Sequence, residues 1–589
     1  MIELLRSLHA AFPLRDSMRH VARLSAWDRY QASVGINRAA DYVAKILTGC
    51  GLEVAIHRLP CPSRWWSFDG PTSWTPHRAE LSVAGQLIAR YPDDAMCLAA
   101  YSVQTGRTEA ALSNPGHREL KGTVLLADGL ALGEAIEIAQ RGEAIGIIAD
   151  PLAGRLPGAR GRIELPQTTG LFAFSVTGEE MAVLRGARSV AVEVEVARDA
   201  PMPLVEALLP GEDDQEILLQ AHLCHPRPGA NDNASGAAAV LGLASALSSL
   251  PGRRRRGIRF LFGPEFVGTV AYLHDFVERG RRPRPLAAIN LDMVGENQAL
   301  CGGPLTLELP PDHLPSPLGP LAAHVMNLVA GAGETYSGAR AFTSSTATTV
   351  PFVGASDHGV HADRTVAIPA IMIGHWPDRF NHTSLDALDK VDPEELRRAA
   401  LIAGAACWTL VTADRQAHDA LQRMIVYHTM QRLLSASQSG GRADILDHIA
   451  RCGEMTIDAL ENLTDTRDAC GRVTIRAQRA LLRSLESASA PEAPVDVGGT
   501  LTRTWAGPFN VRGLLHAVSG PHANRLRHRL ANDKRTYAAI LAIALAIDDA
   551  SSRTGIVRRA AHSSMLQLDP AFADDVFDAM LSAAWIREP

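Results

Sequence analysis

Residues 200 to 413 alternate between short, almost uninterrupted apolar runs and helix-like runs, and this pattern constrains the fold more than any other feature. The apolar runs are EILLQAHL, GIRFLFG, PLAAINLDMVG and AIPAIMIG, separated by stretches such as SGAAAVLGLASALSSL. Strands without polar alternation are buried on both faces, as in parallel or mixed sheets covered by helices on each side. We therefore predict an α/β domain with a mixed, mostly parallel sheet flanked by helices.

The remaining sequence predicts two further units. A chain of 589 residues is too long for one core and is typical of three or four domains at ~150 residues each. Residues 1–60 read as helices followed by a strand, and we assign them with 200–415 to the α/β domain. Residues 61–199 contain short strand-like pieces such as GTVLLAD and AIGIIAD, which indicate an inserted β-rich domain. Residues 416–589 are mostly helical.

Charge and cysteine usage exclude several classes of protein. The net charge of −6 provides no general attraction to nucleic acid or to a membrane surface. The four arginines at 253–256 read as a solvated loop rather than a nucleic-acid site. Eight cysteines are scattered without paired spacing, which favours a reducing compartment. The longest apolar run, 537–547, is well short of the roughly 20 residues that span a bilayer. We expect a soluble, cytoplasmic protein.

Metal-ligating residues follow the predicted strands. In an open α/β sheet, ligands bind beyond the carboxyl ends of the strands. Each such residue alone is more often a capping or turn residue, but four strands that deliver imidazole and carboxylate groups to one edge predict a metal site. This combination of ligands favours zinc or a similar divalent ion. In chain order the candidates are His222, His225, Asp232, Glu265, Asp292 and His382.

Five motifs carry a resemblance to a known family. In order they are AHLCHP, GANDNASGAAAVL, FLFGPE, NLDMVG and NHTSLDALDKVD. Together they resemble the zinc aminopeptidase family of peptidase clan MH, over 200–413 and the first 60 residues. More narrowly, the chain resembles aminopeptidase-like proteins with an inserted β-rich domain and a C-terminal winged-helix region. Residues 122–150 are similar to a protease-associated domain, which shapes access to the site in relatives.

The resemblance implies a function and roles for the candidates. Asp232 would match the carboxylate that bridges two zinc ions, while Asp292 and His382 would each hold one ion. Glu265 would match a glutamate of the family at the tip of its strand. The implied activity is hydrolysis of an N-terminal aminoacyl amide bond, in a peptide or an aminoacyl conjugate, with one or two zinc ions activating water.

The sequence departs from the family at the first strand. The family pattern is His-x-Asp, in which the Asp orients the ligand His, but this chain reads His222-Leu223-Cys224. Either His222 or His225 is then the ligand, and His225 is favoured because CHP recurs in the narrower group. Cys224 is either a third ligand or a small buried residue, and we favour burial.

A second departure concerns the base. The family has two adjacent glutamates, a general base and a metal ligand, whereas Glu265 is followed by Phe266. If Glu265 is the base, one ion lacks a ligand; if Glu265 is the ligand, another group must take the proton. The stretch GASDHGVHAD offers Asp357, His358 or His361 near the pocket, unless it is simply a polar loop.

Arg379 lies close to His382 in the sequence WPDRFNH. A guanidinium suits bidentate binding of a substrate carboxylate. The alternative, which we favour, is that Arg379 braces the loop through Asp378.

Three other functions remain open. The chain could bind a peptide or conjugate on the same fold without catalysis, or act as a glutaminyl-cyclase-like acyltransferase with a single metal. It could also be a metal-sensing regulator that uses the C-terminal domain. A homo-oligomer is compatible with the sequence.

Overall fold

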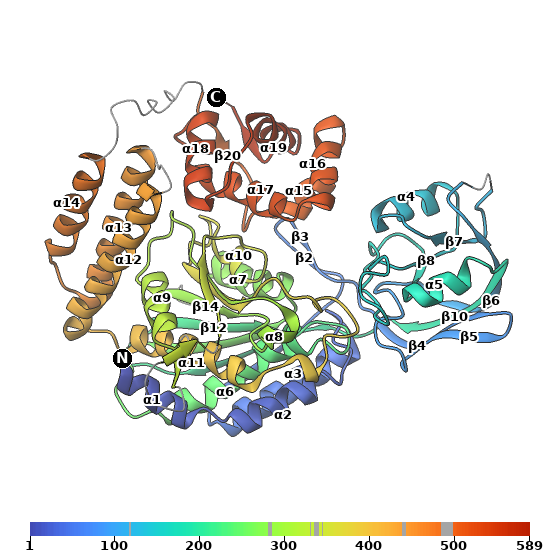
Figure 1. The fold of residues 1–589 in the computed structure, drawn as a ribbon, viewed down its shortest axis with the longest axis horizontal. Coiled ribbons are helices and arrows are strands. Elements are labelled where there is room, and N and C mark those ends of the chain that lie inside the picture. Colours follow the sequence, from blue (N-terminus) through green and yellow to red (C-terminus); the bar gives the residue numbers. More distant parts are fainter. Residues whose placement is uncertain are drawn as a thin grey trace.

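The structure is a computed structural model that describes residues 1–116, 119–280, 285–329, 332–334, 341–343, 345–438, 443–484 and 499–588. Its centre is a mixed sheet of eight strands in the order β1-β11-β13-β12-β14-β19-β15-β18 (Figure 1). The central pairs β13-β12, β12-β14 and β14-β19 are parallel, which confirms the predicted fold class. In that order, the strands are β1 (Glu53–Leu59), β11 (Met202–Leu209), β13 (Gly257–Gly263), β12 (Glu216–His222), β14 (Ala287–Leu291), β19 (Ala370–His375), β15 (Leu305–Glu308) and β18 (Ala347–Val350).

Helices cover both faces of this sheet. On one face, the sheet packs against α3 (Val34–Gly49), α6 (Gly236–Ser249), α9 (Leu318–Val329) and α11 (Pro393–Thr412). Helices α1 (Ile2–Ala11) and α2 (Leu14–Leu24) pack on α6 and α11. The other face packs against α7 (Val267–Arg279) and the short α10 (His358–His361). The short α8 (Gln298–Cys301) follows β14.

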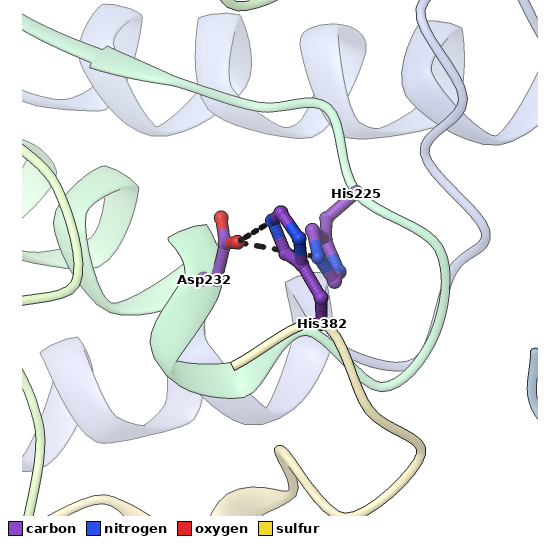
Figure 2. Close-up of side chains that lie close together, drawn as sticks. All are labelled: His225, Asp232 and His382. Carbon is purple, nitrogen blue, oxygen red and sulfur yellow. Dashed lines mark ion pairs between the residues drawn. The ribbon is translucent and has the colours of Figure 1, made fainter. Parts of the chain in front are cut away.

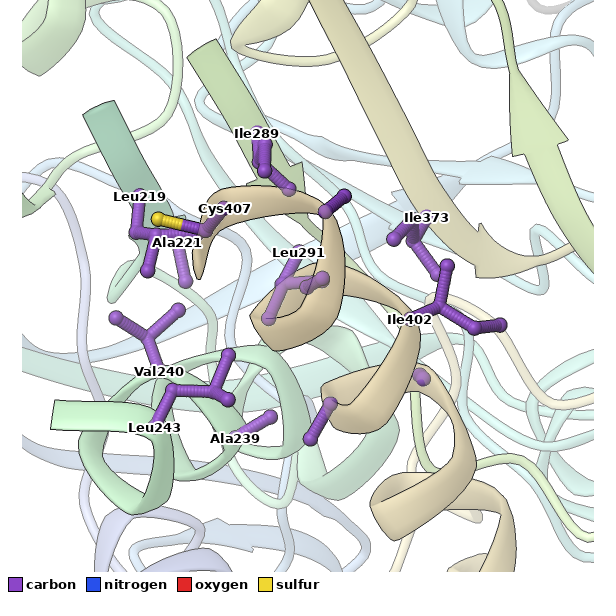
Figure 3. Packing of buried hydrophobic residues seen from close by; sticks show 14 of the residues in the cluster. Leu219, Ala221, Ala239, Val240, Leu243, Ile289, Leu291, Ile373, Ile402 and Cys407 are labelled. Atoms are coloured by element: carbon purple, nitrogen blue, oxygen red, sulfur yellow. The ribbon is translucent and has the colours of Figure 1, made fainter. Parts of the chain in front are cut away.

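Burial on both faces explains why β12 has no polar alternation. Leu219 and Ala221 point toward α6 and α11, where Val240 and Cys407 lie beside them (Figure 3). Leu218 points to the opposite face, into the cluster formed with α7. Alternate residues of one strand thus enter two separate hydrophobic clusters.

The inserted segment forms its own seven-stranded sheet, in the order β5-β4-β10-β6-β7-β8-β9, to one side of the central sheet (Figure 1). Strands β1 and β11, paired with each other, lead the chain out of the central sheet and back into it. The inserted strands are Thr75–Val83 (β4), Gln86–Tyr91 (β5), Thr105–Ser113 (β6), Val124–Ala127 (β7), Gly146–Ala149 (β8), Phe172–Ser175 (β9) and Ser189–Ala197 (β10), with helices Leu132–Arg141 (α4) and Gly178–Leu184 (α5). A small hairpin, β2 (Arg64–Trp65) and β3 (Phe68–Asp69), precedes them.

The C-terminal region is helical. Helices α12 (His418–Gln438), α13 (Ala443–Thr464) and α14 (Cys470–Ser484) pack against one another. A second group surrounds its own core and is closed by the antiparallel pair β20 (Thr502–Arg503) and β21 (Ile586–Arg587). Its helices are Val511–Ala517 (α15), Pro521–Asn532 (α16), Arg535–Ala546 (α17), Arg553–Ser564 (α18) and Pro570–Ser582 (α19). Within the described part of the chain, no helix combines the length and apolarity needed to cross a membrane.

Candidate metal centre

Four parallel strands bring the candidate ligands to one edge of the sheet. His222 is the last residue of β12, Asp292 follows β14 directly, and Glu265 lies two residues beyond β13. His382 stands in the loop after β19. Because β13, β12, β14 and β19 run in the same direction, their carboxyl ends meet at this edge. The six candidates therefore converge there in two adjoining groups.

The first group consists of His225, Asp232 and His382 (Figure 2). Oδ2 of Asp232 lies 3.2 Å from Nε2 of His382 and 3.3 Å from Nε2 of His225. The two imidazole rings lie side by side, with centroids 5.6 Å apart. His382 is half exposed, whereas His225 and Asp232 are buried. This group opens toward solvent on the His382 side.

The second group consists of His222, Glu265 and Asp292, whose ligand atoms lie within 4.8 Å of one another. Nε2 of His222 is 3.2 Å from Oδ1 of Asp292 and 3.5 Å from Oδ1 of Asp232. Asp232 thus directs one oxygen to each group. This placement is the one that a carboxylate shared by two ions requires.

Backbone carbonyls orient both histidines of the first strand end. Nδ1 of His222 donates to the carbonyl oxygen of Cys224 at 3.1 Å, and Nδ1 of His225 donates to that of Pro226 at 2.8 Å. Both rings therefore turn Nε2 into the site, and in the neutral form of each ring this hydrogen bond keeps the proton on Nδ1 and leaves Nε2 for a metal ion. The Cys224 sulfur accepts a hydrogen bond from the Glu265 amide at 3.2 Å and lies 3.8 Å from Nδ1 of His222, the ring nitrogen that does not face the site.

The residues present fit a divalent metal ion. Nε2 of His225 is buried and has no hydrogen-bond partner among the described residues, although Asp232 faces it. A buried polar atom without a partner is costly, and a metal ion would satisfy it. Imidazole nitrogens and carboxylate oxygens in groups of three are the donors that zinc takes in catalytic sites.

Burial and charge divide the protonation states of the two groups. Burial lowers the pKa of His225 to about 4 despite the opposing effect of Asp232. Burial would also lower the pKa of His222, but Asp292 and Glu265 outweigh this effect and hold it well above its ordinary value. Burial raises the pKa of Glu265 to about 8, with Asp292 adding to the rise and His222 opposing it. Without a metal ion, His225 is therefore neutral at pH 7 and His222 is protonated.

The backbone turns sharply at three of these positions. Phe266, Met293 and His382 have positive φ angles of 57°, 60° and 59°. Residues with a Cβ rarely adopt this conformation, and it concentrates at functional sites. Here each such residue is a candidate ligand or directly follows one.

Sequence reasoning missed several residues that hold the ligands in place. Asp386 accepts hydrogen bonds from the amides of Asn231 and Asp232, at 2.8 and 3.0 Å, and so fixes the turn that presents Asp232. Asn381 donates to Oδ2 of Asp232 at 3.1 Å. Both lie within the NHTSLDALDKVD motif, and this motif is the sequence signal that could have identified them.

Arg29 and the inserted segment support the site from a distance. Buried Arg29 donates from Nε to the carbonyl of Leu223 at 2.7 Å, and its backbone pairs with that of His225. The amide of Arg162 donates to the carbonyl of His382 at 2.8 Å, and Gly161 forms a β-bridge with Thr383. No local motif marks these contacts, because they join segments far apart in the sequence.

The residues expected at the substrate surface lie elsewhere. Asp357 is buried and accepts hydrogen bonds from the Phe266 amide at 2.7 Å and from Thr269 at 2.9 Å. His358 is fully buried against Glu308, and His361 is buried against Gln220. These side chains support the start of α7 and the sheet from behind, so a substrate in this arrangement does not reach them.

The brace expected between Arg379 and Asp378 is replaced by other contacts. Oδ2 of Asp378 accepts a hydrogen bond from Nδ2 of Asn231 at 2.9 Å, and its Oδ1 accepts from the amide of Phe380. Within the described part of the chain, no ion pair joins Asp378 to Arg379, whose side chain is exposed.

A helix-covered, mostly parallel sheet with histidines and carboxylates at its carboxyl edge defines an aminopeptidase-like metallohydrolase fold. Residues 205–407 match the model of peptidase family M28, so this part of the chain is a domain of that family. Residues 19–301 also match a domain of unknown function, DUF4910.

Two solved structures have this fold. The zinc aminopeptidase BSAP from Bacillus subtilis aligns with a TM-score of 0.51 and 18% identity, over 68% of this chain and 96% of its own. A "putative peptidase" from Clostridium acetobutylicum aligns with a TM-score of 0.53 and 13% identity, over 100% of this chain and 99% of its own. At these identities the alignments establish the fold alone.

One curated protein is similar in sequence. It is named "Putative polysaccharide biosynthesis protein with aminopeptidase-like domain", from Clostridium acetobutylicum, and is 33% identical over 127 residues. The match covers 21% of this chain and 28% of that protein, so this chain matches little more than a quarter of its curated relative.

Proposed function

We propose that this chain is a zinc-dependent aminopeptidase-like hydrolase that cleaves the N-terminal aminoacyl amide bond of a peptide or an aminoacyl conjugate. The observation that carries the proposal is the position of Asp232, with one oxygen toward His225 and His382 and the other toward His222.

The proposal assigns the ligands to two groups. His225, Asp232 and His382 would hold one ion, while His222, Asp292 and the second oxygen of Asp232 would hold the other. Phe266 occupies the position after Glu265 where the resemblance leads us to expect a ligand glutamate. His225 would supply the ligand lost there, because its Nε2 already faces Asp232 at 3.3 Å.

This assignment leaves Glu265 as the general base. Metal ions bound in the two groups would lower the pKa of water and polarise the scissile carbonyl. Glu265 would take a proton from the attacking water and deliver it to the leaving amine, so that amide and water become carboxylic acid and amine.

The test combines metal content with turnover of aminoacyl p-nitroanilides. We expect close to two zinc ions per chain, fewer in Asp232→Ala, and an unchanged count in His528→Ala, which alters an exposed histidine outside the site. Glu265→Gln should keep the metal and lose about 10²- to 10⁴-fold in kcat, the range for a general base. Binding of no zinc after its addition would contradict the proposal. A single ion with cyclisation of N-terminal glutamine instead of hydrolysis would favour the acyltransferase.

A further inference from the structure

A cleft of about 1020 Å³ adjoins the candidate metal centre at Glu265. Three separate parts of the chain build its walls: the β2–β3 hairpin, the inserted segment and the C-terminal helices. Residues that line it include Trp66, Glu164, Phe266, Arg512 and Tyr537. Figure 1 shows the hairpin between the central sheet and helix α15. The volume is at the upper end of the range for small-ligand pockets, so the cleft has room for more than an amino acid.

The C-terminal wall is held firmly against the rest of the protein. Nδ2 of Asn510 donates to the carbonyl of Ser67 at 2.9 Å, and Nε1 of Trp505 donates to Asp363 at 2.9 Å. Gly507 has a φ of +71°, and a Cβ there would lie 2.1 Å from the ring of Trp66. The core of this helical group also includes Phe352 from the catalytic part. The wall is therefore a fixed part of the cleft.

Arg512 on α15 is the cation that this wall presents beside the centre. Its guanidinium carbon lies 5.9 Å from the centroid of the Phe266 ring, next to Glu265 in the sequence. Within the part of the chain that the structure describes, no carboxylate pairs with the Arg512 side chain, which is exposed to the cleft. A guanidinium held by a ring keeps its N–H edge available for a planar anion.

Other arginines of the same helical group have partners. Arg525 pairs with Asp575, and Arg503 pairs with Asp549. Arg527 donates to the carbonyls of Leu515 and Val518, at 2.6 Å each. These arginines stabilise the fold, whereas Arg512 is left for a ligand.

The surroundings of Arg512 strengthen an ionic contact. Aromatic side chains of Trp505, Phe509, Tyr537 and Trp585 line the same cleft, and apolar walls reduce the screening of charge by water. On the opposite wall Glu164 is paired with Arg162. Burial would raise the pKa of Glu164, but Arg162, and to a smaller degree Arg512, lower it. Arg512 thus contributes to the positive potential at Glu164, which lines the same cleft.

We propose that Arg512 binds a carboxylate on the leaving portion of the substrate, so that the preferred substrates are short peptides with a free C-terminal carboxylate. This inference rests on the proposed function. Glu265 would deliver a proton to the leaving amine, and the leaving portion therefore lies on the Glu265 side of the centre, where the cleft opens. A carboxylate one residue beyond the scissile bond is then within the cleft that Arg512 lines.

The experiment compares a dipeptide with its C-terminal amide. For the wild type we expect kcat/KM to be higher for Leu-Ala than for Leu-Ala amide. Arg512→Gln should lower kcat/KM for Leu-Ala about 10- to 100-fold, mainly through KM, as expected for a lost hydrogen bond to a charged group. The amide should be unaffected, and Arg512→Lys should recover part of the loss. Arg535→Gln, an exposed arginine on α17, is the matched control and should change neither substrate.

Two outcomes would overturn the inference: equal kcat/KM for the two substrates in the wild type, or an equal loss for both substrates in Arg512→Gln. If the wild type hydrolyses neither of these substrates nor the aminoacyl p-nitroanilides, the proposed function fails, and binding decides the inference separately. Calorimetry should then show that Leu-Ala binds more tightly than its amide, and that Arg512→Gln removes the difference. No such difference would overturn the inference. The zinc content of each variant shows that the centre itself is intact.

Discussion

The backbone carbonyl of Cys224 accepts a hydrogen bond from Nδ1 of His222 at 3.1 Å. This contact takes the place of the orienting carboxylate that the sequence lacks at this position. A carbonyl fixes the tautomer of a ligand histidine as a carboxylate does, but it adds no negative charge. The Cys224 sulfur also lies 3.8 Å from this Nδ1, a longer and weaker contact, so the carbonyl provides the main orienting hydrogen bond.

Replacement of the Cys224 side chain should leave the zinc content of the protein unchanged. We expect Cys224→Ala to retain the wild-type zinc content, because the carbonyl that accepts from Nδ1 of His222 is unchanged. The thiol contacts this Nδ1, at 3.8 Å, and the Glu265 amide, rather than the Nε2 that faces the site. Turnover should fall less than about tenfold, from the loss of one weak hydrogen bond. Elemental analysis and aminoacyl p-nitroanilide assays measure both quantities. Loss of an ion in Cys224→Ala, with His528→Ala unaffected, would show that the thiol is a ligand.

The two ligand groups should load zinc with different pH dependence. The pKa of His225 is lowered to about 4, so this residue has no proton to displace above pH 5. His222, whose pKa is held well above its ordinary value, must lose its proton when it binds a metal. The zinc affinity of the group that contains His222 should therefore increase with pH, by up to about tenfold per pH unit.

Single-group variants can separate these effects. His225→Ala leaves the His222 group, and His222→Ala leaves the His225 group. Competition titrations with a chromophoric chelator at pH 6, 7 and 8 should give the steeper slope for His225→Ala, and calorimetry should detect its released proton. Equal slopes, or a steeper slope for His222→Ala, would contradict the assignment.

Much of this site could be predicted because it depends on the direction of strands. Apolar runs without alternation indicate strands buried on both faces, and parallel strands carry whatever follows them to one edge. This logic places His222, Asp292 and His382 together without any knowledge of side-chain contacts. It also left His222 and His225 as alternatives, since a strand sends neighbours to opposite faces. In the structure β12 ends at His222, so the alternation of side chains along a strand does not apply to His225.

What the sequence could not supply are contacts between distant segments. Arg256 belongs to an arginine run that reads as a solvated loop, yet it is buried and donates to the carbonyls of Leu410 and Ala413 at the end of α11. Asp357 and His358 read as a polar loop beside the pocket, but tertiary packing turns both inward. A polar residue without a nearby partner in the sequence reads as exposed, even where the fold supplies a partner.

Arg29 should be required for the stability of the first ligand group. Its Nε and Nη2 donate to the carbonyls of Leu223 and Gly229, at 2.7 and 3.1 Å, on either side of His225. Arg29→Ala would leave the buried Leu223 carbonyl without this donor and the Gly229 carbonyl with the Ala234 amide at 3.3 Å, at a cost of about 1–3 kcal/mol for an unsatisfied group. Arg29→Lys replaces the planar guanidinium and its several N–H donors with a single ammonium group. This variant should therefore recover only part of the lost stability.

Chemical denaturation and zinc titration together test this role. We expect a lower free energy of unfolding for Arg29→Ala and weaker zinc binding in the group that contains His225. Arg6→Ala, which alters an exposed arginine on α1, should match the wild type in both measurements. Wild-type values for Arg29→Ala would show that the loop holds its shape without the guanidinium.

Glu296 should make the stability of the protein fall as pH rises. Its side chain is fully buried; Oε1 accepts from the amide of Gly303 at 2.9 Å, and Oε2 has no hydrogen-bond partner among the described residues. Burial, with a further contribution from Asp378, raises its pKa to about 8. In the unfolded chain a glutamate ionises near pH 4.3. Between that value and about pH 8 the folded state binds more protons than the unfolded state, so stability decreases with increasing pH.

The variant Glu296→Gln removes this titration while preserving the acceptor for Gly303. At pH 5 its Tm should be close to that of the wild type, because both side chains are neutral when folded. At pH 9 the wild type must bury a charge, and the variant should melt roughly 2–5 °C higher. Glu53→Gln, on the exposed side of β1, controls for the change in net charge. Because Glu296 lies outside the two ligand groups, the difference should persist after zinc is removed with a chelator. A gain that is equal at pH 5 and pH 9 would mean that Glu296 is ionised in the folded protein throughout this range.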